Sequence, residues 1–71
     1  MNRTQKTMRN SMIGLIQQVI VILLSFINTK LRDEYSSLED LCAALDADAA
    51  DITEVLAALD YHYDPTHNQF I

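Results

Sequence analysis

Residues 37–70 read SLEDLCAALDADAADITEVLAALDYHYDPTHNQF, and this stretch decides the fold. Its segments SLEDLCAALD (37–46) and DITEVLAALD (51–60) share one pattern, with apolar residues at positions i, i+3, i+4 and i+7. That spacing is typical of a helix that buries one face. The linker between the segments is short, so the two helices should cross steeply, as in a helix-turn-helix. We therefore predict helices over residues 37–45 and 49–60.

Short-range signals mark where these helices begin and end. Ser37 precedes Asp40 with the spacing of a capping box, and Asp51 precedes Glu54 with the same spacing. Asp48 is an alternative N-cap for the second helix, one turn earlier. Asp46 is expected in the left-handed conformation that glycine usually supplies, because aspartate tolerates it.

After Asp60 the pattern changes from a helical period to an alternation of two. Tyr61 and Tyr63 flank His62, and Asp-Pro-Thr-His (64–67) is typical of a type I turn with proline second. Asn68 can adopt positive φ before the chain returns as a second strand. We predict a hairpin over residues 61–71 that closes the core. Helix, helix and hairpin in this order predict a winged-helix-like outline.

An uncharged, mostly aliphatic stretch precedes this unit, between Asn10 and Thr29. Its apolar residues recur at steps of three and four, which predicts a helix over residues 12–34. Residues 1–11 are expected to form a basic, flexible lead. The chain of 71 residues has room for one domain, here residues 12–71, and the predicted fold class is mostly α.

The apolar helix offers more hydrophobic surface than so small a protein can bury alone. We expect a homo-oligomer that self-associates through one stripe of the helix: Ile13, Ile16, Ile20, Leu23, Leu24 and Ile27. The alternative is a single membrane span, because twenty helical residues cover about 30 Å, the thickness of a bilayer core. Gln17 and Gln18 oppose that alternative. A cytoplasmic location is expected, with the membrane as the alternative.

Charge is divided sharply along the chain. All five Lys and Arg residues lie within residues 1–32, and all ten Asp and Glu residues follow from Asp33 onward. Residues 37–70 contain no cation, whereas phosphate neutralisation by Lys and Arg supplies most affinity for DNA. The sequence therefore favours a protein partner with a basic surface over nucleic acid. A winged-helix-like transcription regulator is the second alternative to a self-associating module.

Residue types with reactive side chains are few. His62, Asp64 and His67 could together hold a metal ion, but neighbouring polar residues are common in turns and no supporting shell is evident. Cys42 occupies an apolar helix position and is expected to pack as a small hydrophobic residue. We predict no catalytic, cofactor-binding or metal-ligating residues, no cofactor and no enzymatic activity.

Two longer motifs carry a family resemblance. The segments LLSFINTKLRDEYSSLEDLC (23–42) and DYHYDPTHNQF (60–70) resemble a family of short bacterial proteins, the domain of unknown function 4250. The resemblance covers roughly residues 21–71. It implies a small soluble bacterial protein and brings no activity, cofactor or catalytic residue. Before residue 21 the family typically shows a short polar lead, whereas this chain has MIGLIQQVIV, which leaves open an oligomerisation helix, a membrane anchor or an upstream start codon.

Overall fold

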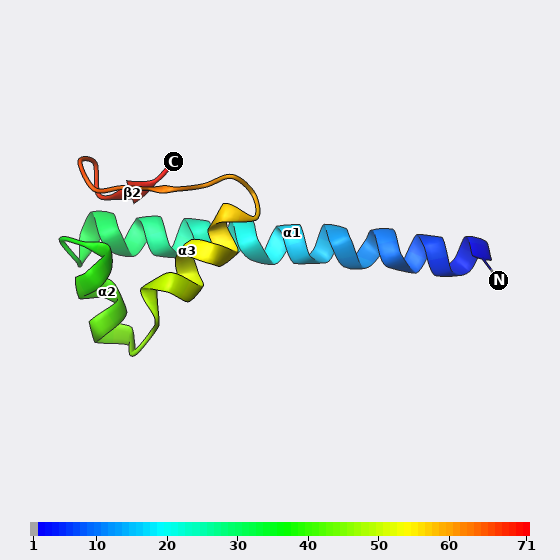
Figure 1. Cartoon of the computed structure of the whole chain (residues 1–71), viewed down its shortest axis with the longest axis horizontal. Coiled ribbons are helices and arrows are strands. Elements are labelled where there is room, and N and C mark those ends of the chain that lie inside the picture. Colours follow the sequence, from blue (N-terminus) through cyan, green and yellow to red (C-terminus); the bar gives the residue numbers. More distant parts are fainter. Residues whose placement is uncertain (1) are drawn as a thin grey trace.

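Residues 2–71 form three helices followed by a two-stranded antiparallel hairpin (Figure 1). The computed structural model describes the backbone of these residues and the side chains of residues 12–71. The elements are α1 (Asn2–Asp33), α2 (Leu38–Leu45), α3 (Ala49–Ala57), β1 (Tyr63–Asp64) and β2 (Gln69–Phe70). The predicted fold class is confirmed: the protein is mostly helical, its first helix is long, and a hairpin ends the chain.

Helix α1 is longer than the predicted 12–34. It begins at Asn2 and ends at Asp33, and residues 2–13 contain no Gly or Pro that would interrupt it. The predicted basic lead over residues 1–11 falls on side chains outside the described set, and Met1 lies outside it altogether. The backbone of residues 2–11 continues the helix without a break.

Helices α2 and α3 begin where the caps were expected. Ser37 Oγ accepts a hydrogen bond from the Asp40 amide at 3.1 Å, and Asp48 Oδ1 accepts one from the Ala50 amide at 2.8 Å. Asp48 rather than Asp51 is therefore the N-cap of α3. Asp46 follows α2 with φ 54°, which confirms the predicted left-handed position.

Helix α3 ends at Ala57, three residues before its predicted end. The chain tightens into turns over residues 58–60, and Asp60 adopts φ 66°. The Tyr61 amide donates to the Leu56 carbonyl at 3.1 Å and the Asp60 amide to the Ala57 carbonyl at 2.9 Å. These paired bonds close the turn that follows α3, in which Asp60 takes the left-handed conformation that glycine usually supplies.

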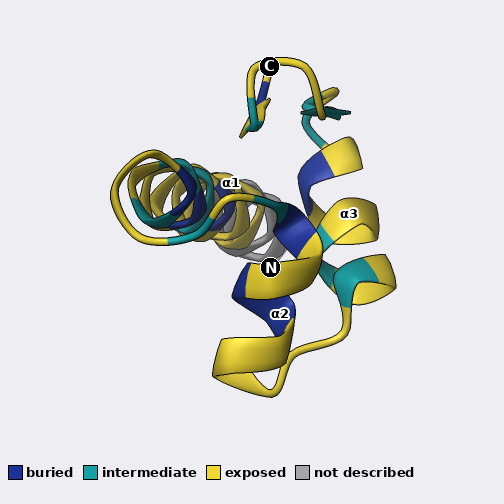
Figure 2. Ribbon diagram, turned by 90° about the vertical axis from the view of Figure 1, so that its left-hand side faces the viewer, coloured by how far each residue is buried: buried dark blue, intermediate teal, exposed yellow. Residues whose placement is uncertain are grey.

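The core lies on one side of the C-terminal half of α1. In the view of Figure 2, α2, α3 and the hairpin gather around part of the α1 surface, and the rest of that surface is exposed. The buried residues come from every helix and from β2: Ile20, Ile27, Leu31, Leu38, Leu41, Cys42, Leu56 and Phe70. Tyr61 and Tyr63 pack against this cluster, as expected for a hairpin that closes the core.

Asn68 fixes the hairpin on the end of α1. Its side-chain amide donates to the carbonyl oxygens of Leu31 at 3.0 Å and Tyr35 at 2.9 Å, at the end of the helix where carbonyls lack helical partners. The Tyr63 hydroxyl donates to Asn68 Oδ1 at 2.7 Å. Asn68 has φ 54°, as predicted for this turn. The hairpin is therefore held both by apolar packing and by polar bonds to α1.

A candidate self-association surface on helix α1

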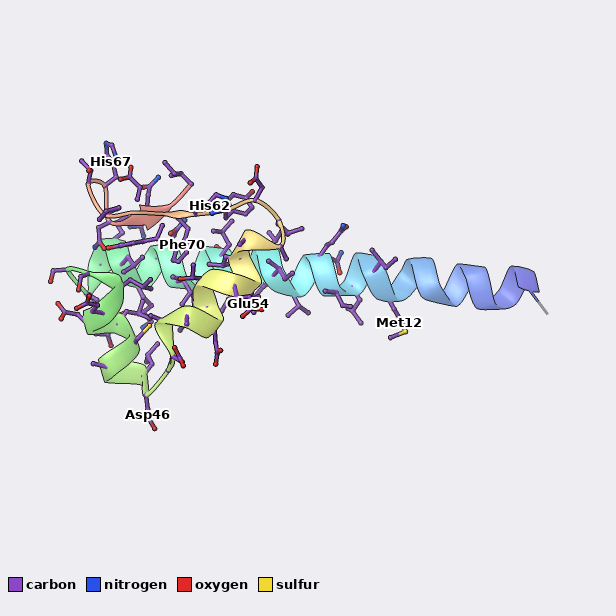
Figure 3. The ribbon with its side chains drawn as sticks, viewed as in Figure 1. Met12, Asp46, Glu54, His62, His67 and Phe70 are labelled. Carbon is purple, nitrogen blue, oxygen red and sulfur yellow. The ribbon has the colours of Figure 1, made fainter. Side chains whose placement is uncertain are left out.

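Helix α1 extends beyond the rest of the fold (Figure 1), and its middle, residues 12–26, is largely apolar and exposed. In Figure 3, Met12 lies on this extending part, away from α2, α3 and the hairpin. Eight large apolar residues of α1 are at least 45% exposed: Met12, Ile13, Leu15, Ile16, Val19, Val21, Ile22 and Phe26. Single exposed apolar residues are ordinary, whereas eight within fifteen residues of one helix form a candidate interaction surface.

The structure separates the six residues predicted for self-association into two groups. Ile20 and Ile27 are buried in the core of the same chain, and Leu23 and Leu24 are partly buried against it. Ile13 and Ile16 continue the same stripe beyond α3 and remain about half exposed, at 50% and 55%. We call these six residues the core stripe, because its C-terminal part packs within the chain. Self-association through Ile13 and Ile16 stays a prediction.

A second stripe runs along α1 about a third of a turn away from the core stripe. Its members are separated by three, four, three and four residues, which is the spacing of a heptad seam. All are at least 45% exposed, and we call them the outer stripe: Met12, Leu15, Val19, Ile22 and Phe26. The outer stripe was not predicted, because the predicted seam took up only one apolar period of α1, although the heptad spacing of the outer stripe is visible in the sequence.

An aliphatic groove joins the outer stripe to α3. Its lining comes from α1, from α3 and from the residue that follows α3, and contains no polar side chain: Leu15, Ile16, Val19, Ile20, Val55 and Ala58. Val55 is 41% exposed even though it lies on α3, which packs against α1. The apolar surface therefore continues from the extending half of α1 onto α3.

The described cations of α1 form salt bridges with acidic residues at the end of the same helix or just after it. Lys30 pairs with Glu34 at 2.5 Å and Arg32 with Asp33 at 2.9 Å. The hydrogen bond to Glu34 raises the pKa of Lys30, and the one to Arg32 lowers the pKa of Asp33. Among the described side chains, no Lys or Arg forms a salt bridge with an acidic residue of α2 or α3.

The polar residues of the hairpin form two separate pairs. His67 Nδ1 lies 2.6 Å from Asp64 Oδ2, and His62 Nε2 lies 3.1 Å from Asp60 Oδ1. The structure thus gives each histidine its own aspartate, and the described residues include no group of three metal-ligating side chains. The hydrogen bond from His67 lowers the pKa of Asp64. These contacts fit a surface turn.

Cys42 and the start of α3 complete the set of residues considered from the sequence. Cys42 is 5% exposed within the core, as expected for a packed residue, and burial raises the pKa of its thiol. Asp51 and Glu54 are exposed on α3, the helix that would approach DNA in a helix-turn-helix. Their charge opposes contact with phosphates.

Comparison with known proteins yields one family. The family model described as domain of unknown function (DUF4250) matches residues 18–70. The match begins within α1, two residues before the first buried core residue, Ile20. It therefore includes the complete core, whereas Met12 and Leu15 of the outer stripe lie before it. No curated protein and no solved structure matches the chain.

Proposed function

The chain belongs to this family of unknown function, and we propose that it is a non-enzymatic interaction module that self-associates through the apolar surface of α1. The observation that carries the proposal is the exposure of eight large apolar residues on one helix, between Met12 and Phe26. Removing apolar surface from water contributes about 25 cal/mol per Å², so a partner that covers this helix is strongly favoured.

The internal packing of α1 supports self-association over a membrane span. Met12–Asp33 is long and apolar enough to cross a bilayer by length and composition. However, Ile20, Ile27 and Leu31 of this segment are buried in the core of the chain. A span over these residues would have to withdraw them from α2, α3 and the hairpin. The membrane span is therefore the second candidate, favoured by composition and opposed by packing.

Acidic α2 and α3 favour protein partners over nucleic acid. The side chains of Asp51 and Glu54 are exposed, and a basic protein surface would complement them. A winged-helix-like transcription regulator is the weakest of the alternatives, because the charges on α3 repel the phosphates that such a regulator must contact. A gel shift at low salt that retards DNA would restore it.

The mass of the protein in solution tests the proposal. We expect size-exclusion chromatography with light scattering, in buffer without detergent, to give a dimer or larger oligomer. A double variant, Leu15→Glu with Ile22→Glu, should be monomeric because each carboxylate would be buried in the seam. Gln17→Glu is the matched control, since it adds a charge to the same helix outside both stripes.

The outcomes separate the candidates. A wild-type monomer at every concentration would overturn self-association. A protein that remains in a carbonate-washed membrane pellet would instead support the span. Circular dichroism of the double variant should match that of Gln17→Glu, which shows that a lost oligomer is not a lost fold.

A further inference from the structure

We propose that the outer stripe pairs with the outer stripe of a second copy of this chain, with the two α1 helices antiparallel. This inference rests on the proposed self-association and adds its partner, surface and direction. The pairing surface is the outer stripe together with the aliphatic groove that continues it onto α3. The core stripe takes no part beyond Ile13 and Ile16, because its other members pack within the chain.

The outer stripe is available along its whole length. Ile22 is 67% exposed and Phe26 is 45% exposed, although both lie beside the folded domain. Figure 2 agrees, since the face of α1 turned away from α2, α3 and the hairpin is exposed. The fourteen-residue interval from Met12 to Phe26 rises by about 21 Å, which gives a second helix about four turns of apolar surface to lie along.

The spacing of the stripe suits a two-fold arrangement. Met12 and Phe26 each lie seven residues from Val19, and Leu15 and Ile22 lie on either side of it. An antiparallel copy related by a two-fold axis near Val19 places Met12 opposite Phe26, and brings Leu15 within one residue, about 1.5 Å along the axis, of Ile22. Each copy then presents the same patch to the other, which is the usual form of a homodimer interface.

Charge decides between the two directions. Residues 1–11 carry Arg3, Lys6 and Arg9 with no acid, a formal charge of +3. Residues 29–71, which include the end of α1 that would face them, carry ten acids together with Lys30 and Arg32, a formal charge of −8. An antiparallel pair brings the basic helix end of each copy alongside the acidic domain of the other, whereas a parallel pair places like charges together.

The antiparallel pair also joins surfaces that the single chain leaves without partners. The middle of α1 in one copy, around Ile22, lies against the groove lined by Val55 and Ala58 in the other. The acids of α2 and α3, which form no described salt bridge with Lys or Arg, then face the basic end of the second copy. Burial and charge thus favour the same direction.

Disulfide trapping distinguishes the directions. Met12→Cys protein and Phe26→Cys protein are oxidised separately and as a mixture. A disulfide requires Cα atoms within about 7 Å, whereas equivalent Met12 positions in the antiparallel pair are about 21 Å apart. We expect a cross-linked dimer from the mixture and none from either variant alone. The wild-type protein, whose only cysteine is the buried Cys42, is oxidised in parallel and gives the background level of cross-linking.

Val19→Cys reports self-association whatever the direction, because Val19 lies near the axis in both arrangements. Cross-linking of Val19→Cys together with a Met12→Cys homodimer would overturn the antiparallel direction and leave self-association intact. No cross-link from Val19→Cys and a monomeric mass would overturn both proposals, and binding of that monomer to lipid vesicles would then identify a membrane as the occupant of the stripe.

Salt and charge provide an independent measurement. Replacing Arg3, Lys6 and Arg9 together by Gln should raise the dimer dissociation constant roughly tenfold at low salt, as expected for several weak surface ion pairs. Added salt should weaken the wild-type dimer and leave the triple variant nearly unchanged. A triple variant that dimerises more tightly than the wild type would instead indicate parallel helices.

Discussion

The Asn28 side chain forms two hydrogen bonds with the backbone of Phe70, a residue at the other end of the chain. Asn28 Nδ2 donates to the Phe70 carbonyl oxygen at 3.1 Å, and Asn28 Oδ1 accepts from the Phe70 amide at 2.8 Å. The amide therefore pairs with one edge of β2 as a neighbouring strand would. An unpaired strand edge would otherwise leave these backbone groups unsatisfied beside the core.

Asn28→Ala should weaken the fold. Both Phe70 backbone groups lose their partner, so the free energy of unfolding should fall by about 2–3 kcal/mol. Thr29→Ala is the matched control, because Thr29 is exposed on the next position of α1, and its effect should stay within about 0.5 kcal/mol. Urea unfolding at one protein concentration measures both variants. Equal midpoints would contradict a role for Asn28.

Substitutions at Asn68 separate backbone conformation from hydrogen bonding. Asn68→Gly and Asn68→Ala both lose the bonds to Leu31, Tyr35 and Tyr63, but only glycine adopts φ 54° without steric cost. Asn68→Ala should therefore be less stable than Asn68→Gly by about 1 kcal/mol. Thermal unfolding compares the two variants, and a more stable alanine variant would contradict this interpretation.

The Asp64–His67 pair predicts a response to acid. The hydrogen bond from His67 lowers the pKa of Asp64 below its usual range, so the unfolded chain binds the proton more readily than the folded one. The stabilisation is complete above the ordinary aspartate pKa and is lost as the pH falls through the lowered folded value. His67→Gln should raise the Asp64 pKa towards its usual value. An NMR titration of the carboxyl carbon measures this, and an unchanged titration would refute the assignment.

Local chemistry explains which features could be predicted from sequence. The caps at Ser37 and Asp48 and the left-handed Asp46 and Asn68 depend on neighbours within a few residues. The contact between Asn28 and Phe70 joins residues 42 positions apart and depends on how the whole chain packs. The spacing of apolar residues along the sequence does not predict it. The end of α3 was misplaced because Ala58 and Leu59 are compatible with a helix, whereas Asp60 takes the left-handed conformation.

The same limit applies to the candidate surface. A stripe of Ile and Leu at helical spacing predicts burial but does not say whether the same chain or another provides the contact. Ile20 and Ile27 were expected at a self-association seam and are in the core, whereas Ile22 was not singled out and is exposed. Helices α2 and α3 and the hairpin pack on one side of α1. These long-range contacts bury most of the core stripe and leave the outer stripe exposed.

Two isoleucines of α1 allow the same substitution to be tested once in the core and once on the exposed outer stripe. Ile27 is 2% exposed and Ile22 is 67% exposed, five positions apart on one helix. Ile27→Ala should reduce the free energy of unfolding by about 2–5 kcal/mol, because it leaves a cavity among core side chains. Ile22→Ala should change the stability of the dilute monomer by less than about 0.5 kcal/mol.

The effects on association should be reversed. Ile22→Ala removes a central member of the outer stripe, so sedimentation equilibrium should show a dimer dissociation constant raised by roughly tenfold or more. Ile27→Ala, measured where it is still folded, should associate as the wild type does. If both variants changed stability alike and association not at all, the outer stripe would be an ordinary exposed surface. The opposite responses would assign core and seam to two stripes of a single helix.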